Sequence, residues 1–275
     1  MDILNELPPR RFREADDLLA FISIYDDTRR TRAFRRLLRT QQKRIRGAVC
    51  AEGGCGLGVL SIEMVKLGAR QVYAIEHNPL LAKLARDRIA QLPGKLAQRL
   101  EVIETPLQNF RPPQKIDVLV HEFYGQLLYD EDLWLLENLK FQPRLVLPDG
   151  GELLAGVVSS QRYTDEVVTA DLLKSLDSVL VAGLFEEKLR TLEFPVLRWR
   201  FGKGLSQIKS TVANKPGDLL CFGVAVTHRG QRICEAGHCP NWSYVWTPRC
   251  GDRFAFEFRS VAEHAGRGCH FRWLS

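Results

Sequence analysis

The sequence predicts an α/β domain built on a parallel sheet, followed by a domain of antiparallel strands with a helical insertion. The first prediction depends on strand and helix patterns that alternate from residue 49 to residue 150, and on the run KIDVLVHEF (115–123). This run is almost wholly apolar, as a central parallel strand should be. The second depends on strand-like runs such as LCFGVAV (220–226) and RFAFEFRSV (253–261), which are separated by turns.

Length and composition are those of a globular protein. The 275 residues, of which 45% are hydrophobic, suffice for one large domain or two small ones. No apolar run approaches the length of a membrane span, and the first residues lack the apolar core of a signal peptide, so we expect a cytoplasmic protein. Seven scattered cysteines do not resemble a disulfide framework, and we expect reduced thiols.

The net charge of +6 is concentrated in the first 46 residues. Such a cluster could bind nucleic acid or an acidic peptide segment, or it could be a solvated helix face. Aromatic residues are not interleaved with the charges as a base-stacking surface requires, so nucleic acid is the less favoured partner. The basic residues are Arg10, Arg11, Arg13, Arg29, Arg30, Arg32, Arg35, Arg36, Arg39, Lys43, Arg44 and Arg46.

The first element along the chain is a helical segment behind a loosely held arm. Pro8 and Pro9 break the arm, which we expect to extend over residues 1–15. The segment YDDTRRTRAF (25–34) marks a break in the helix that follows. Apolar residues recur at helical spacing on both sides of this break, and they are Leu18, Leu19, Ile22, Tyr25, Phe34, Leu37 and Leu38.

The next element is a strand that runs into a glycine-rich turn. An apolar run from Val49 ends in Glu52, and glycines follow at positions 54, 56 and 58, which gives the pattern ExGxGxG. The glycines allow a sharp bend at a strand end and leave no Cβ in the way of a ligand. A helical pattern at 61–66 places the amides of the turn near a helix N-terminus.

The second strand, residues 72–75, ends in Glu76, where a carboxylate can accept hydrogen bonds from both hydroxyls of a ribose. A nicotinamide site would prefer GxGxxG, but Val59 and Ser61 stand where its last glycine would be. An acidic residue at the start of the turn suits a ligand with a cationic amino-acid portion and one ribose, which is S-adenosylmethionine. The alternative is a glycine-rich turn of another α/β protein.

The second informative stretch follows the central strand at 116–120, after a helix at 80–91 and a strand at 100–103. Glu122 lies where this strand ends, at the edge where open parallel sheets bind ligands. Glu131 comes nine residues later, after a turn at Gly125. Two carboxylates beside a methyl donor suit a planar cation with paired N–H donors, which indicates arginine. The alternative for each glutamate is a surface charge.

These motifs resemble those of the protein arginine methyltransferases, and the resemblance covers residues 24–160. It implies an S-adenosylmethionine cofactor, methylation of arginine in a protein or peptide, and catalysis by Glu122 and Glu131. It also implies a Rossmann-like domain at 45–150 behind a helical arm or lid at 1–44, and a β-barrel domain at 151–275. The matching residues are Glu52, Gly54, Gly56, Gly58, Glu76, Glu122, Gly125, Leu127, Tyr129 and Glu131.

The resemblance adds further cofactor-binding residues. Arg30 matches the arginine that pairs with the cofactor's carboxylate, and Thr31 and Phe34 agree with the pattern around it. Gln108 falls where the family has a glutamate near the adenine. The segment LVLPDG (145–150) resembles the exit from the family's cofactor domain.

Departures from the family pattern affect the lid over the cofactor and the substrate side. The family's tyrosine motif is not recognisable before Tyr25, and Asn241 and Trp242 stand where the family has Thr-His-Trp, so the histidine that would partner Asp27 is missing. Tyr124 replaces a methionine, and its larger side chain predicts monomethylated or symmetrically dimethylated arginine rather than the asymmetric product. Tyr124, Asn241 and Trp242 are the substrate-binding residues that the resemblance implies.

The C-terminal part contains one helical pattern, at about 165–192. The family has a helical arm here that forms a dimer, so the resemblance implies a homodimer, but the apolar residues could equally pack on their own barrel. Their stripe consists of Val167, Leu172, Leu173, Leu176, Val179, Leu180 and Leu184.

The cysteines and histidines, and the function as a whole, allow more than one interpretation. A zinc site is disfavoured because the cysteines and histidines are irregularly spaced, so we expect no metal. Its candidate ligands would be Cys234, His238, Cys239, Cys250, Cys269 and His270. His121 could be a general base or could complete the strand end. Two alternatives to protein arginine methylation are methylation of a small guanidine or amine, and a cofactor-binding regulatory protein without catalysis.

Overall fold

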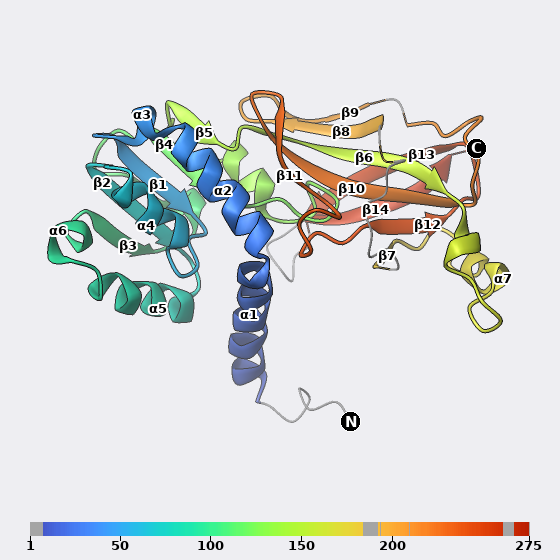
Figure 1. The fold of residues 1–275 in the computed structure, drawn as a ribbon, viewed down its shortest axis with the longest axis horizontal. Coiled ribbons are helices and arrows are strands. Elements are labelled where there is room, and N and C mark those ends of the chain that lie inside the picture. The colour runs from blue at the N-terminus through green and yellow to red at the C-terminus, as the bar shows by residue number, and fades with distance from the viewer. Residues whose placement is uncertain (1–7, 184–191, 193, 209, 261–266, 275) are drawn as a thin grey trace. The chain divides into compact units, whose positions relative to one another are not determined.

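The computed structural model describes residues 8–183, 192, 194–208, 210–260 and 267–274 (Figure 1). The chain forms two compact units, Met1–Glu122 with Asn138–Pro148 and Phe123–Glu137 with Asp149–Ser275. The helices predicted as a separate arm therefore belong to the same unit as the parallel sheet. The segment between the two predicted catalytic glutamates belongs to the second unit, in which Tyr124 contacts Trp199 and Tyr129 contacts Phe258.

The first unit contains a five-stranded sheet in the order β3-β2-β1-β4-β5, and every neighbouring pair is parallel. The predicted Rossmann-like parallel sheet is thus confirmed. The order reverses between β1 and β4, and in open α/β sheets ligands bind in the crevice beyond the carboxyl ends at that point. The strands are β1 (Val49–Gly53), β2 (Gln71–Glu76), β3 (Leu100–Glu104), β4 (Val118–His121) and β5 (Leu145–Leu147).

The helices of the first unit begin earlier than the sequence predicted. A helix already starts at Pro9, so the expectation of a loose arm as far as residue 15 is wrong; proline is well tolerated at the first helical position, where its missing N–H has no partner to lose. No helix in the described residues is long and apolar enough to cross a membrane. The helical elements are α1 (Pro9–Asp26), α2 (Thr28–Thr40), α3 (Gln42–Ile45), α4 (Val59–Lys66), α5 (Pro79–Ala90), α6 (Gly94–Ala97) and the 3₁₀ turn η2 (Leu107–Asn109).

The predicted break between α1 and α2 is present at Asp27. Its carboxylate accepts a hydrogen bond of 2.9 Å from the backbone N–H of Arg30 and so caps α2. The predicted apolar face of α2 is buried, but that of α1 is only partly right: Leu18 is half-buried and Tyr25 lines the candidate site described below. Leu19 and Ile22 are 53% and 51% exposed. Residues on another side of α1, Phe21 and Ile24, line the candidate site described below.

The second unit consists of antiparallel strands, as predicted. Its seven-stranded sheet has the path β7-β12-β10-β6-β8-β9, with β11 paired to β10, and β13 pairs with β14. Every residue of β10 is buried, and the strand pairs with β6, β11 and β12 in the middle of the sheet. The strands are β6 (Gly150–Val158), β7 (Val181–Ala182), β8 (Phe194–Arg200), β9 (Gly204–Gln207), β10 (Leu219–His228), β11 (Gln231–Glu235), β12 (Val245–Pro248), β13 (Arg253–Ser260) and β14 (Arg267–Leu274).

The helical insertion is much shorter than the predicted helix at 165–192. Only α7 (Ala170–Lys174) is an α-helix among its described residues, after the 3₁₀ turn η4 (Ser160–Arg162). Asp165 accepts hydrogen bonds from the N–H groups of Val167 and Val168, which holds the backbone in a turn before the helix can start. Of the predicted stripe, Leu173 is buried and Leu184 lies outside the described residues.

The expectation of reduced thiols throughout is also wrong. Cys234, at the end of β11, forms a disulfide with Cys239, and their Cα atoms are 6.5 Å apart. The turn between them reverses the chain, so two cysteines five positions apart meet. The described residues contain no group of three or more side chains that could hold a metal ion.

Candidate active site

The glycine turn between β1 and α4 forms one wall of the candidate site. Gly54, Gly56 and Gly58 have φ angles of +63°, +50° and +69°, a left-handed conformation that side chains rarely adopt. The alternating glycines of the sequence thus correspond to three left-handed residues. The chain turns within these residues from β1 into α4, whose first residue follows Gly58.

Glu52 lies at the start of this turn and is only 5% exposed. One of its oxygens accepts hydrogen bonds from Ser61, from the backbone N–H at 2.6 Å and from the hydroxyl at 2.5 Å. Burial nevertheless raises the pKa of Glu52 to about 8, against the lowering effect of Ser61. The carboxyl group is therefore protonated at neutral pH, and a cationic ligand nearby would favour its ionised form.

Glu76 ends β2 beside the same turn. Its two carboxylate oxygens accept the backbone N–H groups of Gly56 and Asn78, each at 2.9 Å. These bonds fix the carboxylate and leave each oxygen a second lone pair for a ligand hydroxyl. Gln108 lies in η2, and its side-chain oxygen is buried with no hydrogen-bond partner among the described residues. That oxygen can accept a hydrogen bond from a ligand amine.

Arg30 and Glu122 form the most specific contact of the site. The Nε of Arg30 donates to a carboxylate oxygen of Glu122 at 2.5 Å, and Nη2 donates to the backbone carbonyl of Glu122 at 3.4 Å. The arginine side chain is 3% exposed and the glutamate side chain 25%. An ion pair this well shielded from water is stronger than a surface pair. A guanidinium has five N–H donors, so a ligand carboxylate at Arg30 would share the guanidinium with Glu122.

Glu122 directly follows β4, at the carboxyl end of the sheet. The preceding residue, His121, is fully buried, and its Nε2 lies 2.9 Å from the carbonyl oxygen of Pro148. Burial lowers the pKa of His121 to about 4, so the imidazole is neutral at pH 7 and Nε2–H donates to the carbonyl. This arrangement favours the structural reading of His121 over the general base.

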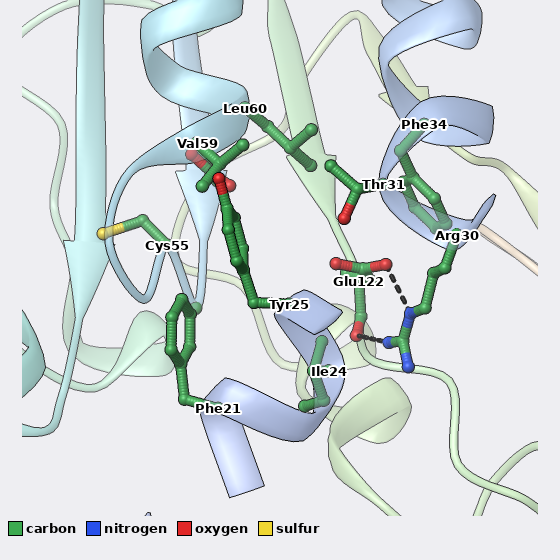
Figure 2. Close-up of a pocket in the computed structure, with 12 residues that line it drawn as sticks. Phe21, Ile24, Tyr25, Arg30, Thr31, Phe34, Cys55, Val59, Leu60 and Glu122 are labelled. Atoms are coloured by element: carbon green, nitrogen blue, oxygen red, sulfur yellow. Dashed lines mark hydrogen bonds and ion pairs between the residues drawn. The ribbon is translucent and has the colours of Figure 1, made fainter. Parts of the chain in front are cut away.

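Helix α1 supplies part of the site that the sequence analysis missed. Phe21, Ile24 and Tyr25 line the same pocket as Arg30 and Glu122 (Figure 2). The aromatic rings of Phe21 and Tyr25 stack with their centres 6.0 Å apart. Tyr25 was among the predicted apolar residues, and Phe21, four positions before it on the same face, was the available signal; the neighbouring leucines and isoleucine suggested a different face.

The pocket brings together residues from four separate stretches of the first unit. Glu122 comes from the end of β4, and Cys55 from the glycine turn. The complete lining is Phe21, Ile24, Tyr25, Arg30, Thr31, Phe34, Glu52, Gly54, Cys55, Val59, Leu60 and Glu122. Its apolar and aromatic walls, two carboxyl groups and one guanidinium suit a ligand that carries both positive and negative charge.

The remaining predicted residues lie in the second unit. Glu131 is exposed, on a loop in which Gly125 and Leu128 form an isolated bridge. Tyr124 is fully buried, and its hydroxyl donates to the carbonyl of Gly150 at 3.0 Å. Trp242 donates from its indole N–H to the backbone carbonyl of Tyr124 at 3.1 Å. The predicted substrate residues are therefore linked, 118 positions apart in the chain. Asn241, which precedes Trp242, is partly buried.

The strand order, the left-handed glycine turn, Glu52 near the end of β1 and Glu76 at the end of β2 define a Rossmann-like domain. Curated proteins that are similar to this chain in sequence are arginine methyltransferases. Protein arginine N-methyltransferase 6 of Danio rerio is 32% identical over 151 residues, which are 52% of this chain and 42% of that protein. The chain thus spans less than half of this relative. No family model matches the chain.

Solved structures share both units of the fold. A crystal structure of PRMT6 matches 94% of this chain and 99% of its own, with a TM-score of 0.71 and 12% identity. The Trypanosoma brucei PRMT1 enzyme–prozyme heterotetrameric complex with AdoHcy matches 91% of this chain and 96% of its own, with a TM-score of 0.65 and 14% identity. The chain is thus similar to protein arginine methyltransferases in sequence over about half of its length, and in fold over most of it.

Proposed function

We propose that this chain is an enzyme that transfers a methyl group from S-adenosylmethionine to a guanidino nitrogen of arginine in a protein or peptide. The observation that carries the proposal is one pocket that joins Glu122 to Glu52 and Gly54 of the glycine turn. A cofactor held by the turn would have its reactive end beside the carboxylate expected to hold the guanidinium. The names of the similar proteins support the same reaction.

The residues present fit this cofactor. Glu76 is fixed by two backbone N–H groups and suits the ribose hydroxyls. The side-chain oxygen of Gln108, which has no hydrogen-bond partner among the described residues, suits the amine of adenine. Arg30 suits the cofactor's carboxylate, and Glu52 suits its cationic amino-acid portion. AdoHcy in the Trypanosoma brucei complex, which is the cofactor without its methyl group, also supports the proposal.

The bound cofactor would supply an electrophilic methyl group on a sulfonium. A free guanidinium is a poor nucleophile because its lone pairs are delocalised and its pKa exceeds about 12. Glu122 and Glu131 would grip the guanidinium, keep its positive charge on two nitrogens and direct the third towards the methyl group. Arg30 holds Glu122 by the bonds described above, so it would position one of these carboxylates as well as bind the cofactor.

Tyr124, Asn241 and Trp242 are the proposed substrate-binding residues. The hydrogen bond from Trp242 to the Tyr124 carbonyl supports a shared role, because it ties the loop of Trp242 to the segment that follows Glu122. We keep the hypothesis that tyrosine at position 124 favours monomethylated or symmetrically dimethylated arginine. Fragmentation mass spectrometry that finds an asymmetric dimethyl product would refute it.

A homodimer and a cytoplasmic location are further parts of the proposal. Val167, Leu172 and Val179 of the helical insertion are 77%, 52% and 48% exposed, and exposed apolar side chains in one segment favour contact with a second chain. Light scattering of the purified chain would test the dimer, with a monomeric mass as the contrary result.

The central test is methyl transfer to a pool of arginine peptides and free guanidines, measured by mass spectrometry beside a Glu122→Gln control. We expect methylated arginine peptides with the natural chain and a loss of at least about 100-fold in the control. Methylation of free guanidines alone would instead favour a small-molecule methyltransferase. Cofactor binding without transfer to any arginine would favour a regulatory protein.

A further inference from the structure

Helices α2 and α3, and the residue that follows α3, carry exposed basic side chains outside the pocket. Residues 28–46 include nine arginines or lysines and no acidic residue. One side of α2 is buried and includes Arg30 and Phe34, which line the pocket. Arg32, Arg36, Lys43, Arg44 and Arg46 are all exposed. We call these five residues the basic face.

The basic face lacks counter-charges in the described part of the chain. Arg35 and Arg39, on the same helix, pair with Glu63 at 3.2 and 2.9 Å. Elsewhere in this unit, on α5, Lys83 pairs with Asp87 at 2.8 Å. None of the five residues of the basic face forms an ion pair or side-chain hydrogen bond within the described residues. A polyanion would therefore not have to displace a carboxylate of the described residues in order to pair with these side chains.

Repulsion between like charges on the basic face also lowers the stability of the fold. Arg32 and Arg36 are one helical turn apart, and like charges at this spacing destabilise a helix. A bound polyanion would relieve this repulsion, so binding and folding are linked: any ligand that binds only the native state raises the free energy of unfolding. This gives a readout of binding that does not depend on methyl transfer.

The geometry points to an acidic protein segment as the partner, and we propose that the basic face is a docking site for one. From Arg32 to Arg36 the helix rises by about 6 Å. In an extended peptide, acidic residues at alternate positions project from one side every 6.6 Å or so, which matches that rise. Single-stranded nucleic acid also needs aromatic platforms for its bases, and Phe34, the aromatic residue of α2, is 1% exposed. The inference goes beyond the proposed function, because docking requires no cofactor.

The test is equilibrium binding, without cofactor, of a fluorescent ten-residue peptide that alternates glutamate and glycine. The charge-reversed variant is Arg32→Glu with Arg36→Glu. The matched control is Arg111→Glu with Lys115→Glu, which changes the net charge equally at two other exposed residues. A second variant, Arg36→Gln with Lys43→Gln, removes charge without reversing it, and circular dichroism verifies that each variant is folded.

We expect the natural chain to bind the peptide at low salt. The affinity should fall at least tenfold in the charge-reversed variant and change by less than about twofold in the control. The peptide should also raise the melting temperature of the natural chain and not that of the charge-reversed variant. Equal losses in both double variants would show binding to net charge alone and overturn the proposal. Absence of binding, or tighter binding of an oligonucleotide of equal charge, would overturn it too. These results leave methyl transfer, measured separately, unaffected.

Discussion

Replacing Gly56 by alanine tests the contact between α1 and the glycine turn. A Cβ at this position would lie 2.1 Å from Cε2 and 2.7 Å from Cδ2 of Phe21, far inside normal contact distance. The φ angle of +50° adds backbone strain for any residue with a Cβ. Gly47 provides the matched control, because its φ is +73° and a Cβ there would have no neighbour within 4 Å.

The two substitutions separate backbone strain from steric clash. Gly47→Ala should lower the free energy of unfolding by about 1–2 kcal/mol, the penalty for a left-handed residue with a Cβ. Gly56→Ala should cost that plus about 1–3 kcal/mol for overpacking, because the Phe21 ring must move and α1 with it. In a Phe21→Ala background the overpacking cost should disappear, because the ring that the Cβ would clash with is absent. The double-mutant cycle should therefore give a coupling of about 1–3 kcal/mol between Gly56 and Phe21.

Urea unfolding can be followed separately in the two units. All five tryptophans lie in the second unit, whereas nearly all helical residues lie in the first. Circular dichroism at 222 nm should thus report the loss of stability of the first unit, while the unfolding transition seen by tryptophan fluorescence should not change. Equal costs for Gly56→Ala and Gly47→Ala, with no coupling to Phe21, would refute the placement of α1 over the turn. Calorimetric titration of S-adenosylmethionine should show weaker binding to Gly56→Ala than to Gly47→Ala.

Three further predictions concern protons and the disulfide. Because the pKa of Glu52 is raised to about 8, the affinity for S-adenosylmethionine should rise by up to about tenfold per pH unit between pH 6 and 8. Calorimetry should find no such pH dependence in Glu52→Gln, and an equal pH dependence in the variant would contradict the role of Glu52 in binding the cofactor. Because the pKa of His121 is lowered from 6.5 to about 4, the stability present above pH 6.5 should be lost as the pH falls to 4, by on the order of 3 kcal/mol, and urea titrations of His121→Gln should lack this loss. Cys234→Ser should cost about 2 kcal/mol, for a closed loop of six residues, with tryptophan fluorescence as the probe. A reducing agent should reproduce that loss in the natural chain and have no effect on the variant.

Several features were predictable because they depend on short stretches of chain. The glycines at 54, 56 and 58 predicted a turn because few other residues adopt a positive φ, and the structure has all three left-handed. Glu76 was predictable as the end of a strand beside that turn. The helix break at Asp27 followed from a polar segment in which aspartate can cap the next helix. Each inference needed only neighbours in sequence and the geometry of a strand or helix.

Other predictions failed where two conformations compete locally. The stripe at 165–192 has helical spacing, but Asp165 and Thr169 accept hydrogen bonds from backbone N–H groups and delay the start of the α-helix to Ala170. On α1, two overlapping sets of apolar residues each form a face, and periodicity cannot choose between them. The choice of Phe21 over Leu19 depends on the space above Gly56, which belongs to another part of the chain.

The sequence by itself thus determined the parallel sheet, the glycine turn and the acidic ends of β1 and β2, since these follow from local backbone preferences and the alternation of strands with helices. Only the tertiary structure decided the partners of the functional side chains. Arg30 meets Glu122 across 92 positions, and Trp242 meets Tyr124 across 118. Such contacts depend on how separate elements pack, and no local pattern encodes the distance between residues that the chain brings together only when it folds.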